Sequence, residues 1–452
     1  MFKKLTVLLS IALLMLTFGI VAAQDTGDLS SVDPSGQTIV YWHEWDGAQL
    51  EAIDQIIANF NENNEWGITV ETVAQGNTGN MGEAMNAAIT SGDLPNLVGA
   101  FSDTAMGYLL DGVLVPLDAY VDDATWGFSE EEKADINFAL IDGFNRIGGE
   151  PFNDQLLAWP IGMSTVALSV NLDMLAELGY ENPPQTLEEF REVSCAAAEL
   201  TTADGGDVQG FPIRLNGQDM EAFIVSQGGS IFDHETNEFN FTNETTISVL
   251  QFFQDLYNDG CAYVPETAFA NTADFAFGLN PMAVGSSVGV PFIRGDIEES
   301  GSGIENWVNT TPPWSEGNRT ILTNFRSVAM IASTPEQQLA TWLFIKHLAS
   351  AESQQIWTET TLYQPYRTTG FEALSPDFLE ANPQFTDIAD ILQDEEVKQY
   401  AGAQVFGYRD AFVEFTNLVA DITTGGMSVE DAAATREAAA NELLSERLEE
   451  LE

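Results

Sequence analysis

The segment Tyr41–Gly47, YWHEWDG, crowds aromatic and acidic side chains at one point of the chain. An apolar pair, Ile39–Val40, precedes it, and apolar residues at helical spacing follow it. Aromatic rings can stack on the apolar face of a polyhydroxy ligand, while carboxylates accept hydrogen bonds from its hydroxyls. We therefore expect Trp45 to face a cleft, with Glu44 or Asp46 accepting such bonds. The alternative is a loop whose aromatics pack under the core, with Asp46 capping the helix.

The elements around this segment alternate between strands and helices. Strands are expected at three places, 37–42, 68–73 and 94–101. Each is followed by apolar residues at helical spacing, which predicts an α/β fold with a parallel sheet covered by helices. Ligands bind outside the carboxyl ends of such strands. The segments that follow the strands add three candidate ligand residues, Asn77, Phe101 and Asp103, although Asp103 could instead cap its helix.

The pattern of strands and helices restarts beyond residue 150. Residues 165–170 alternate as a strand does, and Thr186 with Glu189 predicts the start of a helix. Residues 243–257 form an amphipathic pattern, and 431–452 form a highly acidic helical one. The chain is long enough for two or three ordinary domains.

The N-terminus has the pattern of a signal peptide, residues 1–23. Lys3–Lys4 precede the apolar run Leu5–Val21, which ends in small residues, so cleavage is expected after Ala23. A membrane anchor is the alternative. No Cys stands directly after this run, so attachment of a lipid to a Cys at the cleavage site is not expected. Residues 24–36 read as a flexible acidic tail, and the protein is expected to be exported, either to the periplasm or to the cell exterior.

The negative charge of the chain argues against polyanionic partners. The chain has 70 acidic and 15 basic residues, a formal charge of −55. Such a surface repels nucleic acid and anionic lipid, so neither is expected as a partner.

Cys195 and Cys261 are the two cysteines of the chain. An even pair in an exported chain predicts a disulfide, with two buried thiols as the alternative. The chain has no CxxC, and its three histidines are scattered, so no metal or redox site is expected.

Several segments resemble family 1 extracellular solute-binding proteins of ABC importers. They are GITVETV, AAITSGDLPNLV, LLDGVLVPLDAYV, LLAWPIGMSTVALSVNLDML, PPQTLEEF, QGGSIFD and TPEQQLATWLFIKHLAS. They follow the order of the family and cover most of the chain after residue 23.

The resemblance implies a periplasmic-binding-protein-like α/β fold, in which two lobes are joined by a three-crossing hinge and close over a ligand. The crossings are expected near 161–162, Gly285 and Val328. The lobes would then be 37–161 plus 285–327, and 162–284 plus 328–452.

The resemblance also implies the function. Members of the family bind sugars, oligosaccharides, polyols or glycerol phosphates and deliver them to a membrane permease, without a cofactor. The chain is accordingly expected to be a monomer that binds a sugar and not an enzyme. A binder of glycerol phosphate or a polyol is the alternative, and a secreted glycoside hydrolase is a more distant one.

The remaining candidate residues rest on their places in this pattern. Asp103, Asn216 and Gln218 match sugar-contacting positions of the maltose-binding branch, although the branch has other residue types at the last two. Ser286 lies at the second expected crossing, and Tyr363 lies in a segment often near the ligand.

Three more residues each have two interpretations. Trp159 either forms a cleft wall or is buried under the hinge. Arg326 and Arg367 either donate to a ligand or form internal ion pairs.

Overall fold

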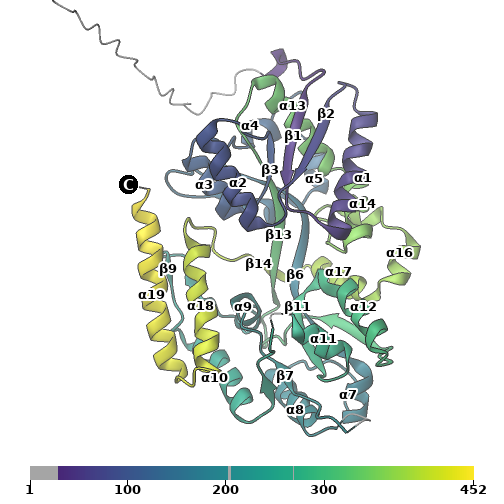
Figure 1. Ribbon diagram of the computed structural model, residues 1–452, viewed down its shortest axis with the longest axis vertical. Coiled ribbons are helices and arrows are strands. Elements are labelled where there is room, and N and C mark those ends of the chain that lie inside the picture. The colour runs from purple at the N-terminus through teal and green to yellow at the C-terminus, as the bar shows by residue number, and fades with distance from the viewer. Residues whose placement is uncertain (1–28, 202–204, 268, 452) are drawn as a thin grey trace, which may run out of the picture.

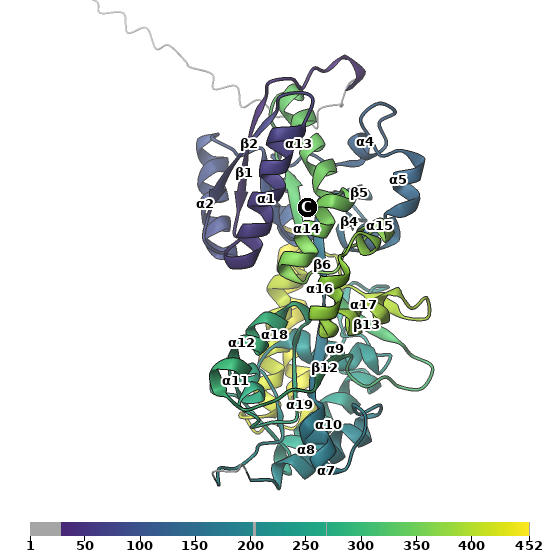
Figure 2. The ribbon, with the colours of Figure 1, turned by 90° about the vertical axis from the view of Figure 1, so that its right-hand side faces the viewer.

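Strands β6 (Trp159–Asn171) and β13 (Thr320–Met330) run along the length of the molecule and join an upper lobe to a lower lobe (Figure 1). The structure is a computed structural model that describes residues 29–201, 205–267 and 269–451. The expected signal peptide and residues 24–28 lie outside these ranges. A side view shows the narrow waist at which the two long strands pass between the lobes (Figure 2).

The upper lobe is an α/β unit built around the first three strands. It contains η1 (Leu29–Ser31), β1 (Thr38–His43), α1 (Gly47–Asn63), β2 (Thr69–Ala74), α2 (Thr78–Ser91), β3 (Leu97–Ala100), α3 (Ser102–Leu110), α4 (Asp118–Val121), α5 (Glu130–Asp135), α6 (Phe138–Asn145), β4 (Arg146–Ile147), β5 (Gln155–Leu156), α13 (Pro335–Leu348), α14 (Ala351–Thr361) and α15 (Thr368–Glu372).

The lower lobe is richer in helices, with short strands between them. It contains α7 (Leu172–Leu178), α8 (Leu187–Ala198), β7 (Phe211–Pro212), α9 (Gly217–Ser226), β8 (Phe232–Asp233), β9 (Glu238–Phe239), α10 (Glu244–Asn258), β10 (Ala262–Tyr263), α11 (Ala270–Ala276), β11 (Met282–Ser286), η2 (Ser287–Gly289), α12 (Val290–Ser300), β12 (Trp307–Thr310), α16 (Pro376–Ala381), α17 (Pro383–Gln393), β14 (Lys398–Tyr400), α18 (Tyr408–Ile422) and α19 (Val429–Glu449).

The main sheet has the order β11-β6-β13-β3-β1-β2, with β12 added to β6 and β14 added to β13. β1 pairs in parallel with both β2 and β3, which confirms the parallel sheet predicted for the first three strands. Both long strands change partners along their length. β6 pairs with β13 through its first half, and with β11 and β12 through its second half.

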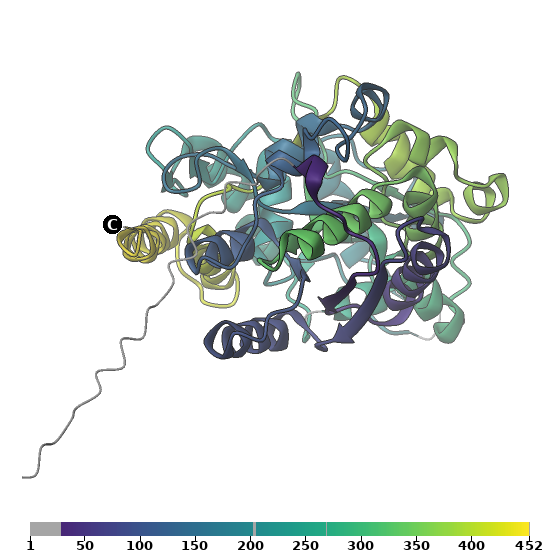
Figure 3. The same ribbon diagram turned by 90° about the horizontal axis from the view of Figure 1, so that it is seen from above.

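Helix α1 shows why these residues form helices over the sheet. Its buried residues Ile53, Ile56, Ile57 and Phe60 recur at i, i+3, i+4 and i+7, so they form one apolar stripe. That stripe enters the same core as Ile39 of β1 and Trp342 of α13. The C-terminal helices α18 and α19 pack on each other at one edge of the molecule, drawn in yellow as seen from above (Figure 3). No helix in the described ranges is both long and apolar enough to span a membrane.

The predicted division into lobes is wrong for 285–327. Strand β12 pairs with the lower half of β6, and α12 packs on α11. The chain therefore stays in the lower lobe after β11 until β13 carries it upward, so the second crossing is β13 and not the segment near Gly285.

The assignment of 328–452 to the lower lobe is wrong for its first part. Trp342 and Phe344 of α13 lie in the upper core with Tyr41, because the apolar face of this helix covers β1. The chain returns to the lower lobe after α15.

The predicted flexible tail also differs from the structure over its described part. Leu29 is buried in the upper core, and its carbonyl accepts a hydrogen bond from Trp126 Nε1 at 3.1 Å.

The predicted disulfide between Cys195 and Cys261 is present in the lower lobe, with a sequence separation of 66. It ties α8 to the residue that directly precedes β10.

We expect the Cys195→Ser/Cys261→Ser double variant to lose about 4 kcal/mol of unfolding free energy, because the bridge no longer restricts the unfolded chain. Urea denaturation with and without a reductant measures this loss. The wild-type protein should lose stability on reduction, whereas the double variant should not respond to reductant. Equal stabilities of the oxidised wild type and the double variant would contradict the prediction.

Candidate functional site

A cavity at the meeting of the two lobes has a volume of about 810 Å³. This lies within the range of about 300–1,000 Å³ that is usual for small-molecule sites. Six of the residues singled out from the sequence line it: Phe101, Asn216, Gln218, Ser286, Arg326 and Tyr363. The structure therefore brings together residues that are spread over more than half of the chain.

Element ends position most of these six side chains. Phe101 directly follows β3 and is the N-cap residue of α3, and Asn216 is the N-cap residue of α9. Ser286 ends β11, and Tyr363 follows α14. Arg326 alone lies inside a strand, at the point where β13 crosses between the lobes. A change in the angle between the lobes would therefore move these side chains relative to one another.

Glu44 does not line the cavity, but it pairs with Arg326, which does. The two side chains form an ion pair of 3.5 Å, and only 11% of the Glu44 side chain is exposed. Burial raises the pKa of Glu44, while the Arg326 charge opposes that change. Gly99 makes this position possible, since a Cβ there would overlap Glu44 Oε2.

Phe101 lies close to two of the arginines that line the cavity. The guanidinium carbon of Arg326 is 4.8 Å from the centre of the ring, and that of Arg409 is 4.1 Å away. These are cation–π distances. Arg409 belongs to α18 of the lower lobe and also pairs with Asp103 of α3 at 3.4 Å. A hydrogen bond from Ser102 to Gln404 joins the same two parts of the chain.

Amide side chains form the lower part of the cavity. Gln218 Nε2 donates to Asn324 Oδ1 at 3.1 Å, and the Asn216 side chain accepts from the Gln218 backbone at 3.0 Å. Amides both donate and accept, so this wall can bind hydroxyl groups in either sense.

The prediction that Trp45 faces the cleft is wrong. Its side chain is 3% exposed, its Nε1 donates to the Tyr41 hydroxyl at 2.8 Å, and its ring meets the edge of Trp357. The turn after β1 folds Trp45 back over Tyr41, so the indole belongs to the core. His43 is buried and accepts the Trp45 backbone N–H at its Nδ1, which is a structural role.

Trp159 is fully buried and forms no cleft wall. It stacks on Phe128, packs edge-on against Trp342, and donates through Nε1 to the Tyr366 hydroxyl at 3.0 Å. The second interpretation, burial under the hinge, is the one that the structure supports.

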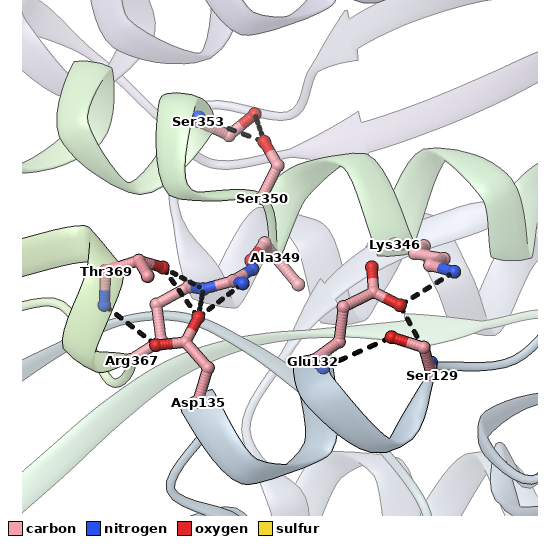
Figure 4. A network of polar contacts seen from close by, with 9 residues as sticks. All are labelled: Ser129, Glu132, Asp135, Lys346, Ala349, Ser350, Ser353, Arg367 and Thr369. Carbon is pink, nitrogen blue, oxygen red and sulfur yellow. Dashed lines mark hydrogen bonds and ion pairs between the residues drawn. The ribbon is translucent and has the colours of Figure 1, made fainter. Parts of the chain in front are cut away.

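Arg367 lies away from the cavity in an internal ion pair. Figure 4 shows its guanidinium against the Asp135 carboxylate, with Nε to Oδ2 at 2.7 Å, and Thr369 bound to the same carboxylate. These contacts hold the pKa of Asp135 below its usual range. Arg367 thus joins α15 to α5 within the upper lobe and has no free face for a ligand.

Three acidic and amide candidates lie outside the main cavity. Asp46 occupies the N-cap position of α1 without a side-chain cap bond, and Asn77 caps α2 by accepting from the Asn80 backbone at 3.0 Å. Asp103 lines a neighbouring cavity of about 100 Å³, which shares Phe101 and Gln218 with the larger one.

The sequence interpretation missed several residues of the cavity wall. They are Ser164, Thr165, Arg214, Phe269, Phe292, Asn324 and Arg409 among others. Two signals were available: Arg409 is one of only 15 basic residues, and Asn324 lies two positions before Arg326. No cluster of metal-ligating side chains occurs within the described ranges.

The chain matches a family model described as bacterial extracellular solute-binding protein over residues 55–387. A curated relative, the maltotriose-binding protein of Pyrococcus abyssi, is 24% identical over 269 residues, which is 58% of this chain and 52% of the relative. The chain thus matches about half the length of that relative.

Two solved structures share the fold across nearly the whole chain. The sugar-binding protein MalE from Xanthomonas citri has a TM-score of 0.74 at 19% identity and covers 91% of this chain and 98% of its own. UgpB from Mycobacterium tuberculosis in complex with glycerophosphocholine has a TM-score of 0.73 at 18% identity and covers 92% and 100%.

Proposed function

Because the chain belongs to the bacterial extracellular solute-binding proteins, we propose that it captures a sugar or oligosaccharide between its lobes and delivers it to an ABC permease. One observation carries the proposal: aromatic, amide and arginine side chains from both lobes line a single cavity of about 810 Å³. Rings can stack on the apolar faces of sugars, and the amides and arginines can bind their hydroxyls. The relative named for maltotriose supports the same class of ligand.

The mechanism that follows is capture by closure, without catalysis. β6 and β13 form the crossing strands, so a small change at the waist opens or closes the space between Phe101 above and Gln218 below. The ligand is bound in the closed state, because only then do both walls contact it. The bound protein should release the saccharide unchanged, which chromatography of the released ligand measures.

Thermal shift of the protein from Gln24 onward, against mono-, di- and oligosaccharides, polyols and glycerol phosphates, tests the proposal. A ligand that binds the folded state alone raises the melting temperature. A selective increase with saccharides is the expected result. No shift with any saccharide, in protein first freed of bound ligand by unfolding and refolding, would overturn the proposal.

A solute that carries a phosphate is the second candidate. Three arginines line the cavity, Arg214, Arg326 and Arg409, although the whole chain has only 15 basic residues. A guanidinium can bind phosphate through two parallel hydrogen bonds. A thermal shift with glycerol phosphates and none with saccharides would favour this candidate.

We expect Arg409→Gln to weaken saccharide binding by about 10- to 100-fold, because a hydrogen bond from a charged donor contributes about 1.5–3 kcal/mol. Isothermal titration calorimetry measures the change. Arg319→Gln is the matched control, because Arg319 also lies over an aromatic ring, that of Trp314 at 4.8 Å, and pairs with Asp394 outside the cavity. Equal affinities of the two variants would remove Arg409 from the site.

A further inference from the structure

Two phenylalanines at the rim of the cavity are unusually exposed. Phe269 and Phe292 each have 75% of their surface accessible, more than any other large apolar residue in the described ranges; Phe277 follows at 54%. Both line the cavity between the lobes. Single exposed apolar residues are ordinary on protein surfaces. Two of them at the same rim of a ligand-sized cavity indicate a surface that is covered when the cavity is filled.

These two residues lie at one end of the cavity, on two helices that pack together. Phe269 is the N-cap residue of α11, and Phe292 lies in the first turn of α12. Arg409 and Gln218 come from α18 and α9, which Figure 1 shows on the opposite side of β6 and β11 from α12. The cavity therefore has one end at which arginine and amide groups lie near Phe101, called here the polar end, and another end at which the exposed rings of Phe269 and Phe292 lie.

Neither ring is covered by another ring. Among the described residues, Phe269 and Phe292 take part in no aromatic pair, whereas Phe275 and Trp307 below them pack on each other at 6.0 Å. Each of the two rings has a polar neighbour on its own helix. Asp296 lies one helical turn after Phe292, and Thr272 lies three residues after Phe269. Both polar residues line the cavity. A flat apolar face with hydroxyl and carboxylate groups at its edge matches a pyranose ring, which has C–H groups on its faces and hydroxyls around its edge.

We propose that Phe269 and Phe292 form a distal subsite that binds a sugar unit beyond the one held at the polar end. The protein would then select ligands by chain length, and its preferred class of ligand is an oligosaccharide and not a monosaccharide or disaccharide. This inference rests on the proposed function, since it assigns the ligand class of the same cavity. The lining residues come from α18 and α9 at one end and from α12 at the other, so two subsites can lie apart in the same cavity.

The test compares affinities along a series of ligand lengths. Calorimetry with malto-oligosaccharides and cello-oligosaccharides of two to five units would be carried out on wild type, Phe269→Ala, Phe292→Ala and the double variant. Wild type should bind longer members of one series more tightly than the disaccharide. The double variant should lose about tenfold or more of affinity for the longer members and keep its affinity for the disaccharide.

Phe277→Ala is the matched control, because Phe277 is also exposed and ends α11 but does not line the cavity. All of these residues lie on the surface, so the variants should fold, which melting temperatures check.

Three results would overturn the subsite while leaving the proposed function intact. An equal loss of affinity at every length would place the phenylalanines at the primary site, and unchanged affinity at every length would remove them from the site. Absence of binding of either series by wild type, with a thermal shift by another saccharide, would exclude the glucan length series and with it this inference. Absence of any saccharide binding would overturn the proposed function itself.

Discussion

Replacing Trp159 by alanine is expected to lower the free energy of unfolding by about 3–5 kcal/mol, the range for removing a large buried aromatic side chain. The indole fills the space between Phe128, Trp342 and Tyr366 in the upper core. Its Nε1 also satisfies the buried Tyr366 hydroxyl at 3.0 Å. Truncation therefore leaves both a cavity and a hydroxyl that has lost its donor. Urea denaturation followed by far-UV circular dichroism measures the loss.

Trp159→Phe separates the two contributions. It keeps much of the apolar packing but loses the N–H together with part of the indole ring, so we expect a smaller loss, of about 1–3 kcal/mol. Ligand affinity of the folded protein should stay near that of wild type in this variant, because Trp159 does not reach the cavity. Normal stability combined with a large loss of affinity in either variant would show that the residue contacts the ligand after all.

Glu221 is expected to make the protein lose stability as the pH rises from about 5 to 8. The side chain is 2% exposed on α9, and the Tyr408 hydroxyl donates to it at 3.4 Å. Burial raises the pKa of Glu221 to about 8. In the unfolded chain the pKa is the ordinary one near 4.5, so between these values the folded state holds a proton that the unfolded state has released.

The sign and the size of the effect follow from that difference. The contribution of neutral Glu221 is fully present below about pH 4.5 and falls by at most about 1.4 kcal/mol per pH unit until pH passes the folded pKa. Glu221→Gln keeps the shape and cannot ionise. Unfolding free energies should be measured at pH 5, 6.5 and 8. The unfolding free energy of Glu221→Gln should rise relative to that of wild type at each step.

Glu446→Gln is the control for Glu221→Gln, because Glu446 lies at an exposed position of α19. Its unfolding free energy should depend on pH in the same way as that of wild type. Other carboxylates also change stability with pH, so the comparison between variants carries the prediction. Parallel curves for wild type and Glu221→Gln would show that Glu221 is ionised in the folded protein.

The alternation of strands and helices at the start of the chain could be predicted because its signals are local. The stripe of Ile53, Ile56 and Ile57 and the apolar runs of β1 and β3 lie within a few residues of one another. The division into lobes could not, because it depends on which strands pair across long distances. β13 pairs with β3 and β6, and that pairing decides that α13 returns to the upper lobe.

The candidate site was predictable in its positions and less so in its aromatic residues. The position after the third strand singled out Phe101, and the resemblance to the maltose-binding branch singled out Asn216 and Gln218; all three line the cavity. Tryptophan was expected to supply the flat surfaces, yet Trp45 and Trp159 are core residues. The burial of an aromatic ring depends on the packing of distant helices, which no local spacing reveals.

The arginines show the same limit. Arg367 and Arg409 both stand beside acidic or hydroxyl residues in the sequence, but the partner of Arg367 is Asp135, 232 positions away. Only the fold tells which guanidinium is fully engaged and which one faces the cavity.

The pairing of β3 with β13 also sets an order of events during synthesis. Leu97 of β3 pairs with Met330, about 230 residues further along the chain; at about 5–20 residues per second that stretch takes roughly 10–50 s to synthesise. Throughout that time β3 has an open edge, and the first lobe cannot be completed. A chain with this topology can therefore complete its upper lobe only late in synthesis, after β13 has been made.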